Sequence, residues 1–326
     1  MIGGFPRSHT LSFERTATSV QSSQFMRQVI LKVAGSASFS GFAHRYGRFL
    51  GARRFYAGDT LDEAIGVVRK LNSENICVTL DHLGESVTTA EDAASQANVY
   101  VDILHAINEA KVDANVSIKL TQMGLDVGRE ECLANMLRIV AAAQETDNFI
   151  RIDMEDSQHT DATLAMVHEL RKTYPRIGTV LQAYLYRSQN DLALLAAAGV
   201  TVRIVKGAYL EPSSVAFPLK SDVDQNYLRL VDMALRAGQY VAIATHDENI
   251  IQEVEGWVRE RRIPLDRFEF QMLYGIRMAR QRELAQQGYR VRCYVPYGTD
   301  WYAYYTRRLA ERPANVFFIL RSLVRS

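Results

Sequence analysis

The feature that most constrains this chain is an alternation between two kinds of segment from residue 55 onward. Short runs of β-branched residues end in polar residues, and each is followed by a turn and a longer stretch with helical spacing. The predicted strands are Ile76–Asp81, Val116–Leu120, Phe149–Glu155, Thr179–Tyr184, Val200–Lys206, Val241–Thr245, Phe268–Leu273 and Arg290–Val295. The predicted helices lie around 60–73, 87–110, 128–145, 159–173, 188–198, 224–237, 248–261, 275–287, 298–311 and 313–324. Eight strands, each followed by a helix, predict the α/β class and a (β/α)8 TIM-type barrel.

An open, doubly wound sheet is the alternative fold. It normally carries a glycine-rich phosphate loop after its first strand. Here the first strand leads into Asp81-His82-Leu83-Gly84, and neither GxGxxG nor GxxxxGK[ST] occurs in the sequence. Several strands read as almost continuously apolar, which is typical of a sheet covered on both faces. Because no Pro/Gly/Ser-rich linker interrupts the alternation, we predict a helical arm over 1–50 and one catalytic barrel domain over 51–326 that ends in a C-terminal helix.

Charge and cysteine usage exclude several classes of protein. A net charge of +1 gives no overall field that favours nucleic acid. The three cysteines are scattered without CxxC spacing, and the histidines follow no metal-ligand spacing, so we expect neither a disulfide framework nor a metal site. These features, with no apolar run of about 18 residues, predict a cytoplasmic protein.

The N-terminal segment supports two interpretations. Residues 1–55 hold eight basic residues and one acidic residue, Glu14. An Arg- and Ser-rich, acid-poor start is typical of an organelle transit peptide. Alternatively, Phe25–Leu31 and Phe39–Phe55 have the spacing of amphipathic helices, as an arm packed on a domain would.

Polar residues collect where the predicted strands end, which is where the active sites of barrel enzymes lie. These residues are Asp81, Lys119, Asp153, Glu155, Gln182, Tyr184, Arg203, Lys206, Thr245, His246, Gln271 and Tyr294. A charge within an apolar strand is costly unless it is paired, and one such case is often a structural ion pair. Many of them at one mouth of a barrel indicate a site.

The segment after the last strand adds a second signal. Tyr304, Arg307, Arg308 and Glu311 fall at i, i+3, i+4 and i+7 of a predicted helix and share one face. Two adjacent guanidinium groups suit a carboxylate ligand. A solvated basic stripe is the alternative, and Trp301 beside Tyr304 argues against it because these rings make the face partly apolar.

At these residues the sequence resembles the proline dehydrogenase family, in its short, single-function bacterial form. The matching segments are RFYAGDTLDEA (54–64), VSIKL (116–120), RIDMEDS (151–157), VLQAYLYRS (180–188), VRIVKGAYLEP (202–212), ATHD (244–247), FEFQMLYG (268–275) and YVPYGTDWYAYYTRRLAER (294–312). They occur in order, one segment for each strand end, over about residues 45–315. The resemblance implies a distorted barrel that carries FAD at the C-terminal ends of its strands. It also implies hydride transfer from L-proline to flavin N5, which gives Δ1-pyrroline-5-carboxylate, with a quinone as electron acceptor.

The resemblance also implies roles for individual residues. Arg307 and Arg308 would hold the substrate carboxylate, Lys119 and Asp153 would form an ion-paired wall of the pocket, and Arg203 would approach flavin N5. The residues that would pack on the proline ring are Tyr209, Leu273, Tyr294 and Tyr304. The residues that would contact the cofactor are Asp153, Gln182, Arg203, Lys206, Gly207, Tyr209, Thr245, His246 and Glu311. No residue has a clear role as a base, so solvent would take the proton from the proline nitrogen.

Some alternatives stay open at this point. The same chemistry on 4-hydroxyproline is one, although Tyr304 is expected to pack where the extra hydroxyl would lie. A Schiff-base aldolase is another, since Lys119 and Lys206 lie at strand ends. A non-catalytic sensor of proline or flavin is a third.

The resemblance also bears on partners. Larger relatives fuse this barrel to an aldehyde dehydrogenase and a DNA-binding module, and the chain ends at Ser326, so we expect a separate pyrroline-5-carboxylate dehydrogenase. Quinone use suggests that Val316–Val324, with the basic N-terminal arm, makes peripheral contact with a membrane. The alternative is that this last helix caps the barrel core.

Overall fold

The computed structural model describes residues 52–311 except 85–86, and for 307–311 it describes the backbone alone. These residues divide between two compact units, one spanning Phe55–Thr299 and one that includes Ala52–Arg54 and the segment from Asp300 onward. The predicted N-terminal helices up to residue 51 and the predicted helix over 313–324 lie outside the described residues. None of the helices in the described part of the chain is long and apolar enough to cross a membrane.

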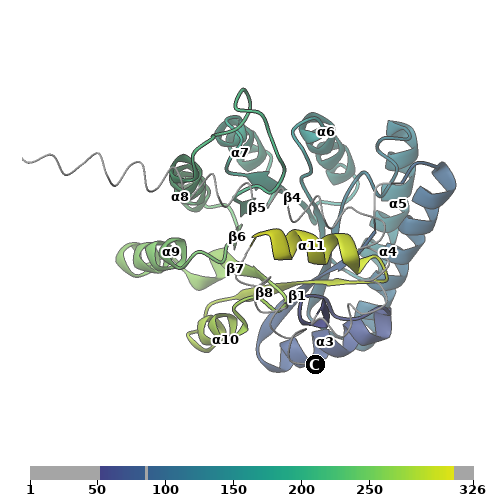
Figure 1. The fold of residues 1–326 in the computed structure, drawn as a ribbon, viewed down its shortest axis with the longest axis horizontal. Coiled ribbons are helices and arrows are strands. Elements are labelled where there is room, and N and C mark those ends of the chain that lie inside the picture. The colour runs from purple at the N-terminus through teal and green to yellow at the C-terminus, as the bar shows by residue number, and fades with distance from the viewer. Residues whose placement is uncertain (1–51, 85–86, 312–326) are drawn as a thin grey trace, which may run out of the picture. The chain divides into compact units, whose positions relative to one another are not determined.

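The larger unit is built on a closed barrel of parallel strands in the order β1 to β8. The strands are β1 (Ile76–His82), β2 (Ala114–Ile118), β3 (Ile150–Ile152), β4 (Ile177–Gln182), β5 (Val202–Val205), β6 (Val241–Ala244), β7 (Phe268–Leu273) and β8 (Val291–Tyr297). In Figure 1 these strands lie in the centre and helices α3 to α10 surround them. The predicted barrel is therefore confirmed, and the open-sheet alternative is excluded because β8 pairs with β1.

The helices of this unit follow the predicted segments closely. They are α3 (Leu61–Ser73), α4 (Ala90–Ala110), α5 (Arg129–Glu145), α6 (Thr160–Arg171), α7 (Ser188–Ala197), α8 (Lys220–Arg236), α9 (Glu248–Arg261), a short 3-10 turn η2 (Leu265–Arg267) and α10 (Met278–Gln286). Local chemistry fixes several of their starts. Thr60 and Glu63 form a reciprocal capping box at α3, and the Asp247 carboxylate accepts from the Asn249 N–H at α9.

The third strand is shorter than predicted. The sequence predicted a strand over Phe149–Glu155, but β3 ends at Ile152. The Asp153 N–H still donates to the Ile118 carbonyl at 2.8 Å. Beyond it, the Glu155 carboxylate accepts from the Thr121 N–H and hydroxyl. The strand therefore ends where the Glu155 side chain, and no longer a neighbouring strand, accepts the hydrogen bonds of the Thr121 N–H and hydroxyl.

Several strands were expected to be almost continuously apolar, and β6 is, whereas β7 and β8 alternate between apolar and polar residues. In β7, Phe268 and Phe270 belong to the apolar core between sheet and helices, while Glu269 and Gln271 are buried polar residues. Successive side chains of a strand point to opposite faces, so the polar set lies inside the barrel. Its members bond to one another across several strands.

The smaller unit is described by itself. It contains a 3-10 turn η1 (Ala52–Arg54) and helix α11 (Trp301–Glu311). The α11 helix confirms the predicted helix at this position. Trp301 packs edge-to-face on Tyr305, with ring centroids 5.9 Å apart.

Candidate functional site

Arg203 lies at the centre of the polar cluster inside the barrel. It stands on β5 and is 5% exposed. Its Nη1 donates to Asp153 Oδ1 at 2.7 Å, and its guanidinium lies over the Tyr294 ring at 5.2 Å. Its Nη2 is buried and has no hydrogen-bond partner among the described residues. A buried guanidinium nitrogen costs free energy unless it finds an acceptor, so this atom marks a place for a ligand.

Asp153 is held by three donors at once. Besides Arg203, the Ser117 hydroxyl donates to Asp153 Oδ1 at 2.6 Å and the Tyr294 hydroxyl donates to Oδ2 at 2.9 Å. Burial, and next the charge of Asp153, raise the pKa of Tyr294 well above its usual value. Tyr294 therefore keeps its proton and remains the donor. These contacts join residues of β2, β5 and β8 to Asp153, the residue directly after β3.

Gln271 connects Arg203 to the lower part of the barrel. Its Oε1 accepts from Arg203 Nε at 2.6 Å, and its Nε2 donates to Glu269 Oε1 at 2.5 Å. Because a carboxylate only accepts and a guanidinium only donates, these partners fix the orientation of the Gln271 amide. Glu269 in turn forms a buried ion pair with Arg292, whose Nε lies 3.0 Å from Oε1.

Lys119 has a different partner from the one predicted. Its Nζ lies 2.9 Å from Asp81 Oδ1, and it does not form the expected pair with Asp153. Asp153 instead pairs with Arg203. Burial alone would lower the pKa of Lys119, but the charges of Asp81 and then Asp153 outweigh it and raise this pKa. Lys119 is therefore a firmly protonated ammonium.

Gln182 ends β4, and Glu155 lies in the loop after β3. Gln182 is buried and its Nε2 donates to the Glu155 carbonyl at 2.8 Å. Burial is the largest influence on the Glu155 carboxyl and raises its pKa, while hydrogen bonds from Thr121 act in the opposite direction. Both residues therefore help to brace the loop after β3.

Lys206 and Gly207 follow β5, where contact with the cofactor was predicted. The Lys206 ammonium lies between the carboxylates of Asp224 and Asp247, at 2.5 and 2.7 Å. Gly207 has a φ of +116°, and a Cβ at this position would collide with the Tyr184 ring. A side chain is thus excluded at Gly207 by both backbone conformation and space.

The remaining predicted residues of the barrel unit lie at or after the ends of β5, β6 and β7. Thr245 is buried, and its hydroxyl accepts from the Asp247 N–H at 3.0 Å. His246 Nε2 accepts from the Leu273 N–H at 3.0 Å. Tyr209, by contrast, is 40% exposed.

The predicted carboxylate clamp belongs to the other unit. Helix α11 is continuous from Trp301 to Glu311, so the helical spacing of Tyr304, Arg307, Arg308 and Glu311 holds. Tyr304 is buried. The side chains of Arg307, Arg308 and Glu311 lie outside the described residues. Their roles remain predictions.

Sequence reasoning overlooked Ser117 and Glu269. Each lies two residues before a predicted polar residue of the same strand, Ser117 before Lys119 and Glu269 before Gln271. The signal that would have found them is the period-2 pattern of VSIKL and FEFQML, in which every second residue is polar.

Comparisons with known proteins agree with this architecture. The sequence profile of the family described as proline dehydrogenase matches residues 64–321. Proline dehydrogenase 1 of Bacillus subtilis is 43% identical over 300 residues, which cover 92% of this chain and 99% of that protein. The proline dehydrogenase of Deinococcus radiodurans is 43% identical over 93% of this chain and 99% of its own length.

Solved structures extend the likeness to larger proteins at the level of fold. Proline utilization A from Bdellovibrio bacteriovorus, inactivated by N-propargylglycine, superimposes with a TM-score of 0.77 at 23% identity, over 89% of this chain and 36% of that one. With a family match over most of the chain and two relatives of similar length above 40% identity, the chain belongs to the proline dehydrogenase family.

Proposed function

We propose that this protein oxidises L-proline to Δ1-pyrroline-5-carboxylate with bound FAD. The observation that carries the choice of substrate is the 43% identity to proline dehydrogenases along 92% of the chain. When bound, the flavin supplies the acceptor for the hydride that leaves the ring carbon next to nitrogen.

The residues at the strand ends fit such a cofactor. Arg203 offers a buried nitrogen without a partner among the described residues, in the position expected to face flavin N5. Asp153 and Gln271 hold its other nitrogens, so the guanidinium is oriented before any ligand arrives. Gly207 allows a close backbone approach after β5. We therefore propose that Arg203, Gly207, Gln182, Thr245 and His246 contact the cofactor.

The charges inside the barrel bear on how the substrate is held. Lys119 pairs with Asp81, and Arg203 pairs with Asp153. Each pair holds one cation, whose charge is already balanced by a carboxylate of the protein. The substrate carboxylate therefore needs cations from elsewhere in the chain. We propose that Arg307 and Arg308 supply them through a two-pronged guanidinium contact.

We assign no general base. The Asp153 oxygens already accept from Arg203, Ser117 and Tyr294. Solvent therefore takes the proton that proline nitrogen must lose before its lone pair can form the C=N bond. The protein contributes by orienting the ring and the hydride.

The Schiff-base alternative loses support from the contacts of both lysines. Imine formation needs a neutral amine. Lys119 pairs with Asp81 and has a raised pKa, and Lys206 lies between two carboxylates. Neither is prepared as a nucleophile.

The test is the visible spectrum of the purified protein before and after anaerobic addition of L-proline. We expect flavin bands that bleach as Δ1-pyrroline-5-carboxylate forms. Bands that bleach faster with 4-hydroxyproline would move the proposal to that substrate, and bands that never bleach would leave a flavin-binding sensor. A protein that stays colourless after reconstitution with FAD would contradict the proposal.

The clamp has its own test. We expect Arg307→Met to raise the KM for proline by about a hundredfold or more, since a charge-assisted pair at a desolvated site contributes several kcal/mol. Flavin content should not change. An unchanged KM would remove Arg307 from the clamp.

We also propose a quinone as electron acceptor, peripheral contact with a membrane and a separate pyrroline-5-carboxylate dehydrogenase. Reduction of a soluble quinone analogue by proline-reduced protein tests the first. Co-sedimentation with anionic vesicles, with and without residues 313–326, tests the second. If the parent protein did not associate with the vesicles, the proposed membrane contact would be contradicted. For the third, we expect the purified protein to release Δ1-pyrroline-5-carboxylate without oxidising it when NAD is supplied.

A further inference from the structure

A polar pocket of about 520 Å³ lies at the N-terminal ends of the barrel strands, away from the strand ends discussed above. Residues near the starts of the strands from β2 to β8 line it. Those on its inner wall are Asn115, Arg151, Thr201, Tyr240, Glu269 and Arg292.

Arg151 is the residue that requires explanation. It is 3% exposed, and among the described residues no carboxylate lies within ion-pair distance of it. Its Nη1 donates to the carbonyls of Thr179 and Thr201, both at 2.9 Å. A Cβ on Gly178 would come within 2.6 Å of this nitrogen, so glycine leaves room for it. Its guanidinium also lies over the Phe149 ring, 4.8 Å from the centroid. A buried cation without a counter-ion is costly. Burial, followed by the nearby Arg203 charge, lowers the pKa of Arg151 to about 9.

Two neutral groups in the same wall also present donors. The Thr201 hydroxyl is buried and has no partner among the described residues. The Asn115 Oδ1 accepts from the Thr79 hydroxyl at 2.5 Å, which leaves the amide NH2 as the group that Asn115 offers to the pocket. The wall therefore offers the Thr201 hydroxyl, which lacks a partner among the described residues, and the Asn115 amide NH2.

The acidic groups of the pocket are already engaged. Glu269 accepts from Arg292 and Gln271 and lies 3.3 Å from Arg290. Asp113 lies 3.9 Å from Arg290 and 4.0 Å from Arg292. The third carboxylate, Asp147, pairs with Arg176. Five cations, with Lys111 among them, therefore face three carboxylates in the pocket lining, and no ion pair among the described residues includes Arg151.

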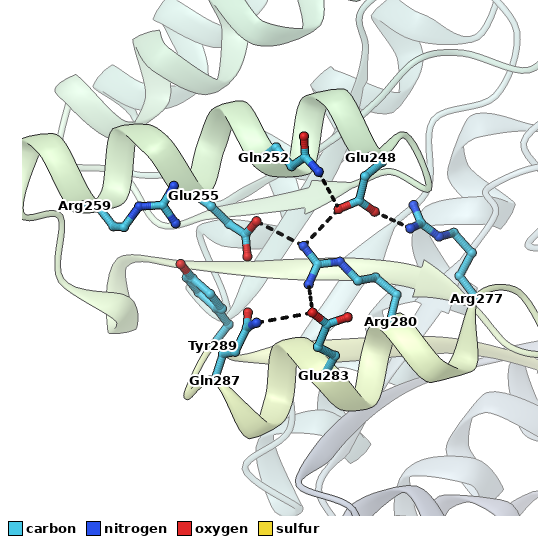
Figure 2. A pocket seen from close by; sticks show the side chains of 9 residues that line it. All are labelled: Glu248, Gln252, Glu255, Arg259, Arg277, Arg280, Glu283, Gln287 and Tyr289. Atoms are coloured by element: carbon cyan, nitrogen blue, oxygen red, sulfur yellow. Dashed lines mark hydrogen bonds and ion pairs between the residues drawn. The ribbon is translucent and has the colours of Figure 1, made fainter.

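The groove between α9 and α10 shows the opposite case (Figure 2). Its volume is similar, about 570 Å³, and it is also lined by arginine and glutamate. Arg280 lies 3.0 Å from each of Glu248, Glu255 and Glu283. Arg259 and Arg277 bring the arginines to three, equal to the glutamates, so this groove has no excess charge to be neutralised.

We propose that the pocket at the N-terminal end of the barrel binds a small oxyanion, a carboxylate or a phosphate, with Arg151 as its charged ligand and Thr201 and Asn115 as neutral donors. A planar guanidinium beside hydroxyl and amide donors matches the geometry of such groups. A negative charge there gives Arg151 the counter-ion that it lacks among the described residues. This inference does not depend on the activity proposed above.

The experiment titrates the purified flavin-bound protein with sodium phosphate and, separately, sodium acetate, at an ionic strength held constant with sodium chloride. Isothermal titration calorimetry and the melting temperature are the readouts. We expect saturable binding of one of the two anions and a melting temperature that rises with it. Arg151→Met should weaken binding by about tenfold or more, and Thr201→Val by about threefold. The matched control Arg259→Gln removes a cation from the balanced groove and should bind like the parent.

The result that would overturn the proposal is an absence of saturable binding of both anions, or a response to chloride that equals theirs. Equal affinities in the parent and in Thr201→Val would also overturn it. Arg151→Met loses two contacts to carbonyls and can fail to fold. Thr201→Val keeps the shape of the side chain, so it tests the proposal in that case. If Arg259→Gln weakened anion binding as much as Arg151→Met, the effect would be one of overall charge, and the proposal would be contradicted.

Discussion

The two ends of the barrel interior use the same inward-facing positions for different purposes. Near the C-terminal ends of the strands, Asp153, Gln271 and Tyr294 surround Arg203 and leave Nη2 unengaged. Toward the N-terminal ends, Glu269 and Arg292 close on each other, and Arg292 also donates to the Val78 carbonyl at 2.7 Å. A closed ion pair is part of the framework, whereas an oriented group with an unused donor is available to a ligand. The two groups therefore differ in whether every hydrogen-bond donor already has a partner, and not in burial or charge.

The largest effect is expected at the closed pair. Arg292→Leu leaves Glu269, which is 2% exposed, without its principal counter-charge. We expect the free energy of unfolding to fall by about 3–5 kcal/mol, as is typical when one partner of a buried pair is removed. Urea denaturation measures it. The double variant Glu269→Gln/Arg292→Met, which removes both charges, should recover much of the loss, and a double variant as unstable as the single one would contradict the pairing.

The open end should respond in activity. Asp153→Asn removes the charge that holds Arg203 while preserving side-chain size. We expect kcat/KM for proline to fall by about 10- to 100-fold, because a hydrogen bond to a charged group contributes about 1.5–3 kcal/mol. Steady-state kinetics with a quinone analogue measures it. If the melting temperature dropped as far as in Arg292→Leu while kcat/KM held, the contrast between the two ends would fail.

Gln271→Met tests whether the two ends are coupled. This change removes the amide that joins Arg203 to Glu269 with little change of volume. We expect a smaller loss, about 1–2 kcal/mol, in both transition-state stabilisation and unfolding free energy. A double-mutant cycle with Asp153→Asn should give a coupling energy of about 0.5–3 kcal/mol. Strict additivity would show that Gln271 does not position Arg203.

The smallest effect concerns an ion pair outside both ends. His159 lies 2.8 Å from Asp126 and 2.7 Å from Asp156. Burial alone would lower its pKa, but these carboxylates outweigh burial and raise it. The stabilisation is therefore fully present below about pH 6.5 and is lost as the pH rises through the raised folded-state pKa. Compared with His159→Gln, the parent should gain about 0.5 kcal/mol at pH 6 and nothing at pH 9 after solvent screening. An equal difference at both values would exclude the ionic contribution.

The placement of the arginine pair was predictable only in part. The spacing of Tyr304, Arg307, Arg308 and Glu311 predicted a helix, and α11 is helical through all four positions. Helical periodicity depends on near neighbours in the sequence and is therefore visible in it. The contacts of Arg307 and Arg308 depend on side chains outside the described residues, so their assignment still rests on family resemblance.

The sequence by itself determined the eight strand–helix units, their parallel direction and the polar character of the strand ends, because each depends on local periodicity and on the pattern of turns. Only the tertiary structure decided which polar groups meet. Lys119 was expected to pair with Asp153, but closing the barrel places it beside Asp81 and brings Arg203 from β5 to Asp153. The physical reason is that a barrel interior joins residues from strands far apart in the chain. Partner choice there follows from register and height along the barrel axis, which no local pattern records.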